Sequence, residues 1–231
     1  MPWLRDPVDD YLAALEHAAR GSVPGAMLRI VLGLALCWWI YVPIHELLHA
    51  YGCLWSGGSV TRLDIDAIYG AALLQRWFPF VAVGSEHAGQ LVGFDTHGSD
   101  LVYLVTCLAP FALTVFPGVA LLRWAARLQS APQAGWLLGA AIPLAFAPFI
   151  SLPGDFYEIG SILVTRVAVL FDPALDMKRW RSDDLFGLLD RLAPTATALD
   201  WGIVAGAFVL GLILALTTYA LGRRLAVLIV R

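Results

Sequence analysis

Long apolar stretches divide the chain and predict membrane-spanning helices. Three of them contain no charged side chain, and each is about as long as the roughly 20 apolar residues that cross a bilayer as a helix. They are Leu101–Leu122, Leu128–Gly154 and Trp201–Gly222. A fourth, Ala26–Tyr51, is interrupted by Arg29 near its start and by a polar cluster near its end. Ile159–Phe171 is shorter and carries Arg166, and it predicts a fifth span if that span begins near Asp155.

Two shorter segments carry an apolar stripe at helical spacing. In Asp6–Arg20 the stripe is Val8, Tyr11, Leu12 and Leu15. After Ser182-Asp183-Asp184 the same spacing recurs at Leu185, Leu188, Leu189 and Leu192. Stripes of this kind predict amphipathic helices that lie in the membrane interface or pack on the bundle. A short capped helix at the protein surface is an equal alternative for both.

The loop Leu54–Asp100 follows the first predicted span and is the longest polar stretch. Gly57-Gly58 interrupts the helical pattern, after which Leu63, Ile65 and Ala67 alternate with Asp64 and Asp66. This alternation predicts a strand, and Phe78–Val83 predicts a second one. We therefore expect a small β-hairpin, which either offers an edge to a partner strand or serves as an inert connection.

Composition supports a polytopic membrane protein. Hydrophobic residues make up 59 % of the chain, charged residues 14 %, and the mean hydropathy is +0.73; soluble domains carry about 25 % charged residues. No basic tract suggests nucleic acid. The cysteines Cys37, Cys53 and Cys107 are odd in number, and we expect free thiols. Met1–Gly25 lacks an apolar core, so we expect the first span to act as an uncleaved membrane signal.

The polar cluster in the first span is His45-Glu46-Leu47-Leu48-His49, a complete HExxH motif. On a helix, positions i and i+4 share a face, so both imidazoles can bind one metal ion while Glu46 reaches a water molecule beside it. Ionisable side chains in an apolar span are costly and mark functional sites. The alternative is a pair of buried histidines hydrogen-bonded to neighbouring helices.

Catalytic zinc usually has three protein ligands and one open position, so a further ligand is needed. Asp155 and Glu158 are the candidates, because they follow an apolar stretch and Pro153-Gly154 should break the helix there. One can bind the metal while the other orients a histidine or the water. Alternatively, both are ordinary carboxylates at a helix start. His87 and His97, in the polar loop, are expected to be solvated.

Together these residues resemble the site-2 protease family of intramembrane zinc metalloproteases. In that family one membrane helix carries HExxH, which His45, Glu46 and His49 match. A later helix supplies an Asp from a motif similar to Asn-x-x-Pro-x-x-Pro-x-Asp-Gly, of which Pro153 and Asp155 match the Pro-x-Asp. The other motif positions differ, at Ala147, Ile150 and Phe156.

Two further segments lie where the family has related features. Leu108-Ala109-Pro110 is similar to a small-residue and proline motif, and Gly57–Ile65 occupies the place of a membrane-associated β-hairpin. The resemblance covers roughly Ala26 to Phe171. The apolar stretches, the alternating loop and the two stripes together predict an all-α polytopic membrane protein with about four to five transmembrane helices, a small β-hairpin loop after the first span and interfacial amphipathic helices.

The expected organisation has four parts. An amphipathic segment at 1–25 precedes a metalloprotease core at 26–171 with its β-type loop at 54–100. A loop with an amphipathic helix follows at 172–200, and a transmembrane helix with a basic tail at 201–231. We expect a multi-pass protein of the bacterial cytoplasmic membrane.

The resemblance implies peptide-bond hydrolysis in or near the bilayer, with a transmembrane protein or peptide as the substrate. His45, His49 and Asp155 would hold Zn²⁺, with Glu158 the alternative third ligand, and Glu46 would act as the general base. A zinc-binding scaffold or regulator without proteolytic activity is one alternative. A small proton or metal-ion transporter is another, although Leu101–Leu122 and Trp201–Gly222 lack the charged residues of a transport path.

Overall fold

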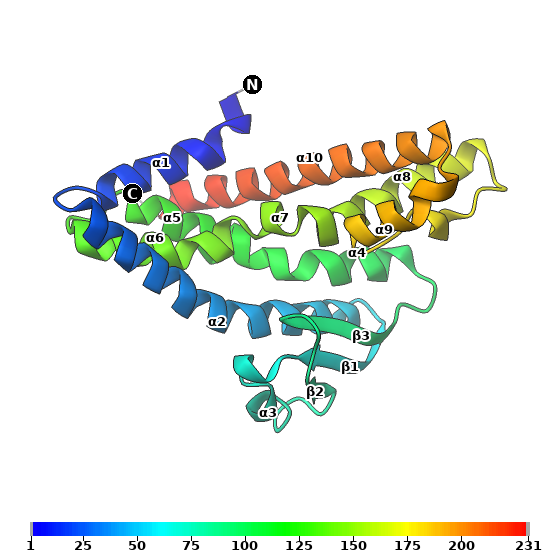
Figure 1. Cartoon of the computed structure of the whole chain (residues 1–231), viewed down its shortest axis with the longest axis horizontal. Coiled ribbons are helices and arrows are strands. Elements are labelled where there is room, and N and C mark those ends of the chain that lie inside the picture. Colours follow the sequence, from blue (N-terminus) through cyan, green and yellow to red (C-terminus); the bar gives the residue numbers. More distant parts are fainter. Residues whose placement is uncertain (1, 230–231) are drawn as a thin grey trace. The chain divides into compact units, whose positions relative to one another are not determined.

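The structure, a computed structural model, describes residues 2–229, which form helices and one small sheet (Figure 1). The chain divides into two compact units, Met1–Ala147 with Thr218–Arg231, and Pro148–Thr217. The α-helices are α1 (Asp6–Ala18), α2 (Val23–Trp55), α3 (Ala71–Leu74), α4 (Asp100–Leu108), α5 (Val119–Ala125), α6 (Ala131–Ala145), α7 (Ala147–Ile150), α8 (Tyr157–Phe171), α9 (Leu185–Leu192) and α10 (Ala198–Ile229).

Three helical segments of the described chain are long and apolar enough to cross a membrane. They are Val23–Trp55, Asp100–Ala125 and Ala198–Ile229, and they contain three of the predicted spans. The predicted span Leu128–Gly154 is divided between α6 and α7, because the chain leaves helical geometry at Phe146. The predicted fifth span falls in α8, which has 15 residues. The structure thus supports a membrane protein with three candidate spans, and the count of four to five stays a prediction.

Helices α2 and α6 pack closely through two glycines of the first unit. A Cβ atom at Gly33 would lie 2.5 Å from the carbonyl oxygen of Trp136, and one at Gly139 would lie 2.2 Å from that of Ile30. Both distances are shorter than real side chains allow, so the two backbones meet where only glycine fits. The face of α2 toward α6 is therefore fixed along its first half.

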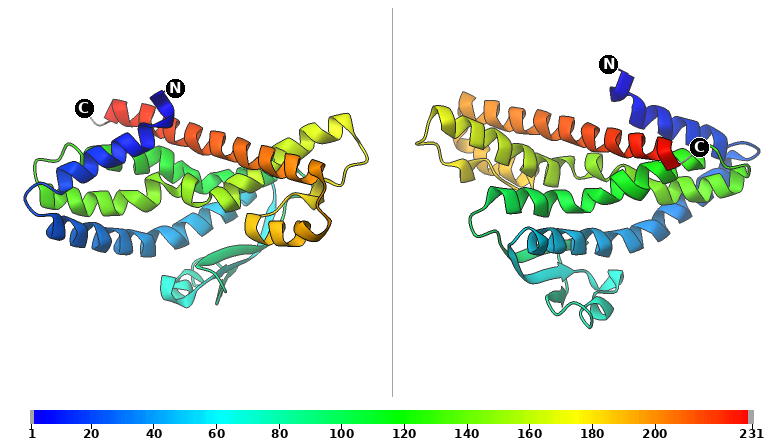
Figure 2. Two further views of the ribbon diagram at one scale, coloured as in Figure 1. Left: turned by 45° about the horizontal axis from the view of Figure 1, so that its top comes forward. Right: turned by 180° about the vertical axis from the view of Figure 1, so that it is seen from behind.

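Helix α1 lies beside α5 and α6 (Figure 2) and is held by an ion network. The Asp10 carboxylate accepts hydrogen bonds from Arg123, Tyr219 and Arg223 at 2.9–3.1 Å. The face that packs on the bundle therefore carries Asp10 and small residues. Val8, from the predicted apolar stripe, is 56 % exposed. The amphipathic helix is confirmed, and part of its apolar stripe faces away from the first unit.

The second amphipathic helix, α9, packs within the second unit. Leu185, Leu188 and Leu192 are buried in a core with Tyr157 and Trp180. Asp184 caps the helix, since its carboxylate accepts from the backbone N–H of Phe186. The prediction offered a helix in the membrane interface or a helix packed on the bundle. Packing within the second unit explains why these leucines are buried.

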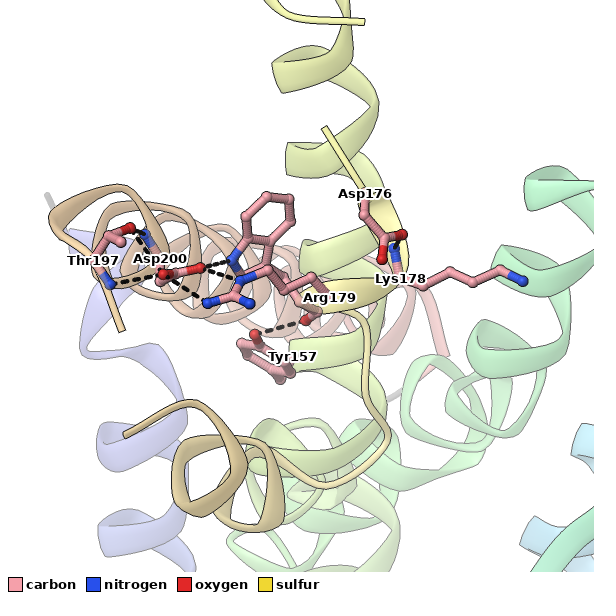
Figure 3. Close-up of polar contacts among 7 residues, drawn as sticks. Tyr157, Asp176, Lys178, Arg179, Thr197 and Asp200 are labelled. Atoms are coloured by element: carbon pink, nitrogen blue, oxygen red, sulfur yellow. Dashed lines mark hydrogen bonds and ion pairs between the residues drawn. The ribbon is translucent and has the colours of Figure 1, made fainter. Parts of the chain in front are cut away.

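A carboxylate organises the start of α10 in the same unit (Figure 3). Asp200 and Thr197 form a capping box, in which the Asp200 carboxylate accepts from the backbone N–H of Thr197 at 2.7 Å. Arg179 and the indole N–H of Trp180 donate to the same carboxylate at 2.6 and 2.8 Å. The hydrogen bond from the Arg179 guanidinium to Asp200 raises the pKa of Arg179. The Tyr157 hydroxyl donates to the carbonyl of Trp180, so one loop is fixed to two helices.

The polar loop after α2 contains a three-stranded sheet rather than the predicted hairpin. Strands β1 (Ser59–Ile65), β2 (Val81–Val83) and β3 (Gly89–Asp95) lie in the order β2-β1-β3. The two predicted strands, β1 and β2, pair in parallel, because helical turns at 67–74 return the chain to the same end of the sheet. The hairpin prediction was therefore wrong, and the antiparallel partner of β1 is β3, which the sequence reading did not identify.

This sheet is fixed to the second half of α2 (Figure 1). Leu63, Ile65 and Val81 are buried on its inner face and form one core with Ala50 of α2. Arg62 and Asp64 alternate with these residues, and the Arg62 guanidinium donates to the Asp64 carboxylate at 2.7 Å. The alternation that predicted β1 thus reflects one face against α2 and one polar face.

The α2–α6 contact predicts a stability difference between two glycine substitutions. Gly139→Ala places a methyl group against the backbone of α2, so we expect it to destabilise the fold by about 1–3 kcal/mol. Gly202→Ala in α10 is the matched control, because no described heavy atom lies within 4 Å of its added Cβ. Thermal unfolding in detergent should show a lower Tm for Gly139→Ala only. An unchanged Tm for Gly139→Ala would contradict the close packing.

Gly202 also begins the pattern Gly202-x-x-x-Gly206, which permits close helix contact, but no described atom approaches Gly202 closely. In the second unit the close approaches occur elsewhere. An added Cβ at Gly160 would lie 2.1 Å from the carbonyl oxygen of Ala207, and one at Gly211 would lie 2.5 Å from that of Phe156. Spacing along one helix does not show which glycines face a neighbour.

Candidate metal centre

The two histidines of the motif converge on the buried side of α2. His45 and His49 are each 8 % exposed, and their Nε2 atoms lie 3.1 Å apart. Two nitrogens that bind one tetrahedral zinc at about 2.05 Å are separated by about 3.3 Å. The observed spacing fits one metal ion between the two imidazoles.

The second ring nitrogen of His49 selects the tautomer of the neutral imidazole. His49 Nδ1 lies 2.9 Å from the backbone carbonyl oxygen of Thr106. A carbonyl can only accept, so Nδ1 carries the proton and donates it. Nε2 of the neutral ring then keeps its lone pair, which a metal requires.

Pro110 explains why the Thr106 carbonyl can accept this bond. In a regular helix the carbonyl of residue 106 would accept from the backbone N–H of residue 110. Proline has no N–H, so that bond is not formed, and α4 ends at Leu108 with a tighter turn at Ala109–Phe111. The interruption of one helix thus supplies the acceptor that orients a histidine of another.

His45 is oriented from its own helix. Its Nδ1 lies 2.6 Å from the hydroxyl oxygen of Tyr41, one helical turn earlier in α2. When Nε2 binds a metal, Nδ1–H donates to this oxygen, the usual arrangement behind a metal-binding histidine. The ring of Phe111 packs edge-on against His45 with centroids 5.6 Å apart, so one side of the imidazole contacts an apolar ring.

The third ligand predicted from the sequence, Asp155, lies in the second unit, whereas His45 and His49 lie in the first. Asp155 belongs to a distorted turn at Leu152–Phe156, where Gly154 has non-helical angles (φ −106°, ψ −112°). The predicted break at Pro153-Gly154 is therefore present. Two imidazoles and one carboxylate are a ligand set that zinc uses in hydrolases.

The other candidates take different positions. Glu158 is buried in the first turn of α8, in the second unit. His97 is exposed and pairs with Asp95 at 3.2 Å, and His87 is also exposed, as expected of loop histidines. Glu46 is half-buried, and its side chain lies against Gly89 at the start of β3.

Four residues around the two histidines and Glu46 were not predicted from the sequence. They are Tyr41, Thr106, Phe111 and Gly89. Tyr41 had a usable signal, because it lies four residues before His45 and therefore on the same face of α2. Thr106 contributes only a backbone carbonyl, which no side-chain pattern reports. Comparisons with protein-family models, curated proteins and solved structures gave no match to this chain.

The Tyr41–His45 contact predicts a measurable effect on metal affinity. Tyr41→Phe removes the hydroxyl that accepts from His45 Nδ1–H, and loss of such a partner typically lowers metal affinity about 10–100-fold. The Kd for added Zn²⁺, measured against a competing chelator, should rise in that range. Tyr51→Phe is the matched control on the same helix, since Tyr51 contacts Trp55 and Phe78 instead. Equal affinity in both variants would show that Tyr41 does not support the centre.

Proposed function

We propose that this chain is an intramembrane zinc metalloendopeptidase that hydrolyses peptide bonds in or near transmembrane segments. The observation that carries the proposal is the pair of imidazoles in α2. Their Nε2 atoms converge, their Nδ1 atoms have partners, and Glu46 lies between them in sequence. A separation of 3.1 Å also permits a hydrogen bond between the two rings, so zinc binding is the property that separates this proposal from a packing role.

The location of the pair supports chemistry at the membrane. His45 and His49 belong to Val23–Trp55, one of the three helices long enough to span a bilayer. Burying two imidazoles and a carboxylate there is unfavourable unless they bind an ion or a substrate. With Asp155 as the third ligand, the site would offer two nitrogens and one oxygen, which leaves a fourth position for water or substrate.

The chain's own residues supply the remaining steps. Zn²⁺, when bound, polarises the scissile carbonyl and makes water nucleophilic near neutral pH. The Glu46 carboxylate accepts one proton of the attacking water and transfers it to the leaving amine nitrogen as the C–N bond breaks. The second proton of the water passes from the new carboxyl group to the amine, so the products are a carboxylate and an ammonium group, and Glu46 ends in its starting state. Asp155 would be the third ligand, and Glu158 the alternative.

The substrate class follows from the site's position. A peptide carbonyl inside a helix is shielded by its own hydrogen bond, so a transmembrane substrate must be locally unwound at the cleavage point. The sheet beside the second half of α2 has a free edge at β3, which could receive an extended segment. Spans with helix-weakening residues are therefore the expected substrates.

Zinc content tests the ligand set. Purified wild type should hold close to one zinc per chain, His49→Ala and Asp155→Asn should lose it, and Glu158→Gln should keep it. His97→Ala is the matched control, because His97 is a loop residue paired with Asp95. Loss of zinc in Glu158→Gln with retention in Asp155→Asn would make Glu158 the third ligand. Wild type that binds no zinc when supplied with it would refute the proposal.

Cleavage tests the activity itself. Purified chain would be incubated with single-span model proteins that carry Gly, Pro or Asn in the span, and products would be identified by mass spectrometry. Glu46→Gln should lower kcat about 10²–10⁴-fold while zinc remains bound. Glu16→Gln, an exposed glutamate of α1, is the matched control. The chelator 1,10-phenanthroline should abolish cleavage, and its non-chelating 1,7 isomer should not. Zinc binding without cleavage would favour the scaffold alternative.

A further inference from the structure

The first residue of β3 lies against the side chain of Glu46. A Cβ atom at Gly89 would lie 2.4 Å from Glu46 Cγ, 3.0 Å from Cδ and 3.4 Å from Oε1. The first distance is shorter than real Cβ contacts allow. The backbone of the strand therefore occupies the space beside the carboxylate, and only glycine permits this approach.

The requirement for glycine at this position is steric rather than conformational. The described glycines with positive φ are Gly21, Gly57, Gly70, Gly84 and Gly98, and Gly89 is not among them. Its backbone would accept an alanine, but the space for a methyl group is filled by Glu46. Relief of the collision requires Glu46 to rotate near its backbone, and such a rotation moves the whole carboxylate.

The strand cannot simply withdraw, because the sheet is fixed to the same helix. Gly89 pairs with Ile65 of β1, and Ile65 is fully buried in the core that contains Ala50 of α2. Leu47, the residue after Glu46, packs against that core. The sheet thus holds the helical turn that carries Glu46 and also bounds the side chain itself.

We propose that Gly89 is a positioning residue for the proton transfer by Glu46. This inference rests on the proposed function. A general base must lie within hydrogen-bond reach of the proton it takes, and a misplacement of about 1 Å can lower a rate about 10²-fold. The backbone at Gly89 limits the rotamers that Glu46 can adopt, and we infer that the allowed ones direct the carboxylate to the proton that it takes. The polar loop is therefore part of the catalytic apparatus through one glycine.

Gly93 on the same strand supplies a matched control. A Cβ atom there would lie 2.5 Å from Thr61 Oγ1 and 2.8 Å from both the Cβ and the backbone nitrogen of Arg62, so the collision is at least as severe as that at Gly89. Gly93 pairs with Arg62, four residues along β3 from Gly89. Four residues of a strand span about 13 Å, so Gly93→Ala disturbs the sheet away from Glu46.

The experiment compares wild type, Gly89→Ala, Gly93→Ala and Glu46→Gln. Zinc per chain, kcat and KM for one cleaved model span, and the Kd for acetohydroxamic acid would be measured on each. A hydroxamate binds zinc and also hydrogen-bonds to a neighbouring carboxylate, so its Kd reports the position of Glu46 without turnover. Gly89→Ala should retain zinc, lose kcat at least 10-fold with little change in KM, and weaken hydroxamate binding as Glu46→Gln does. Gly93→Ala should leave both unchanged.

The outcomes separate the two proposals. Wild-type kcat and hydroxamate Kd in Gly89→Ala would overturn the positioning role and leave the protease proposal intact. Zinc and hydroxamate binding in wild type without cleavage would refute the protease proposal and the proton transfer with it, and the hydroxamate comparison would then show only whether Gly89 fixes the position of the Glu46 carboxylate. If Gly89→Ala does not fold, Glu46→Ala is added to it, because that change removes Cγ. Recovery of a folded chain by the double variant supports the contact, and failure to recover overturns it.

Discussion

The candidate metal centre depends on one hydrogen bond between two helices, from His49 Nδ1–H to the carbonyl of Thr106. A neutral histidine in an apolar helix has two tautomers, and only one leaves Nε2 free to bind a metal. The carbonyl selects that tautomer because it cannot donate. It is free to do so because Pro110 lacks the N–H that would otherwise occupy it. A proline in one helix thereby determines the chemistry of an imidazole in another.

Close backbone contact is the second constraint, and it recurs around α2. Gly33 and Gly139 bring α2 and α6 together on one side. On the other side Gly52 approaches α4, since a Cβ atom there would lie 2.9 Å from the carbonyl oxygen of Val105. At each contact the backbone of one helix lies directly against the neighbouring helix, with no side chain between them. This close packing restricts rotation of α2 about its axis. The histidines therefore face α4 in a fixed register, and that register makes the bond to Thr106 possible.

The sequence allowed a good prediction of what depends on composition and short spacing. The apolar runs predicted α2, the Asp100–Ala125 segment and α10, and the HExxH spacing predicted two imidazoles on one helical face. The break at Pro153-Gly154 followed from the known behaviour of these residues. These features are local, so the sequence around each one determines them.

The features that the sequence did not reveal depend on distant partners. Strand β3 contains two glycines and a short apolar run, and it becomes a strand because β1 offers it an antiparallel edge. The parallel pairing of β1 and β2 depends on the helical turns between them, which a pattern of alternation does not report. Thr106 contributes its backbone carbonyl, and Gly89 contributes the space left by a missing side chain. The identity of neither residue therefore predicts its place beside the motif.

The length of α2 has a consequence for how membrane thickness acts on this centre. Its 33 residues extend about 50 Å, and at a tilt of about 40° they still project about 38 Å, more than the roughly 30 Å of hydrocarbon in a bilayer. Arg29 favours one boundary, and His45 lies 16 residues further, about 24 Å along the axis. The far boundary therefore falls close to the histidines. The thickness of the bilayer would therefore set how close the aqueous boundary lies to the two imidazoles.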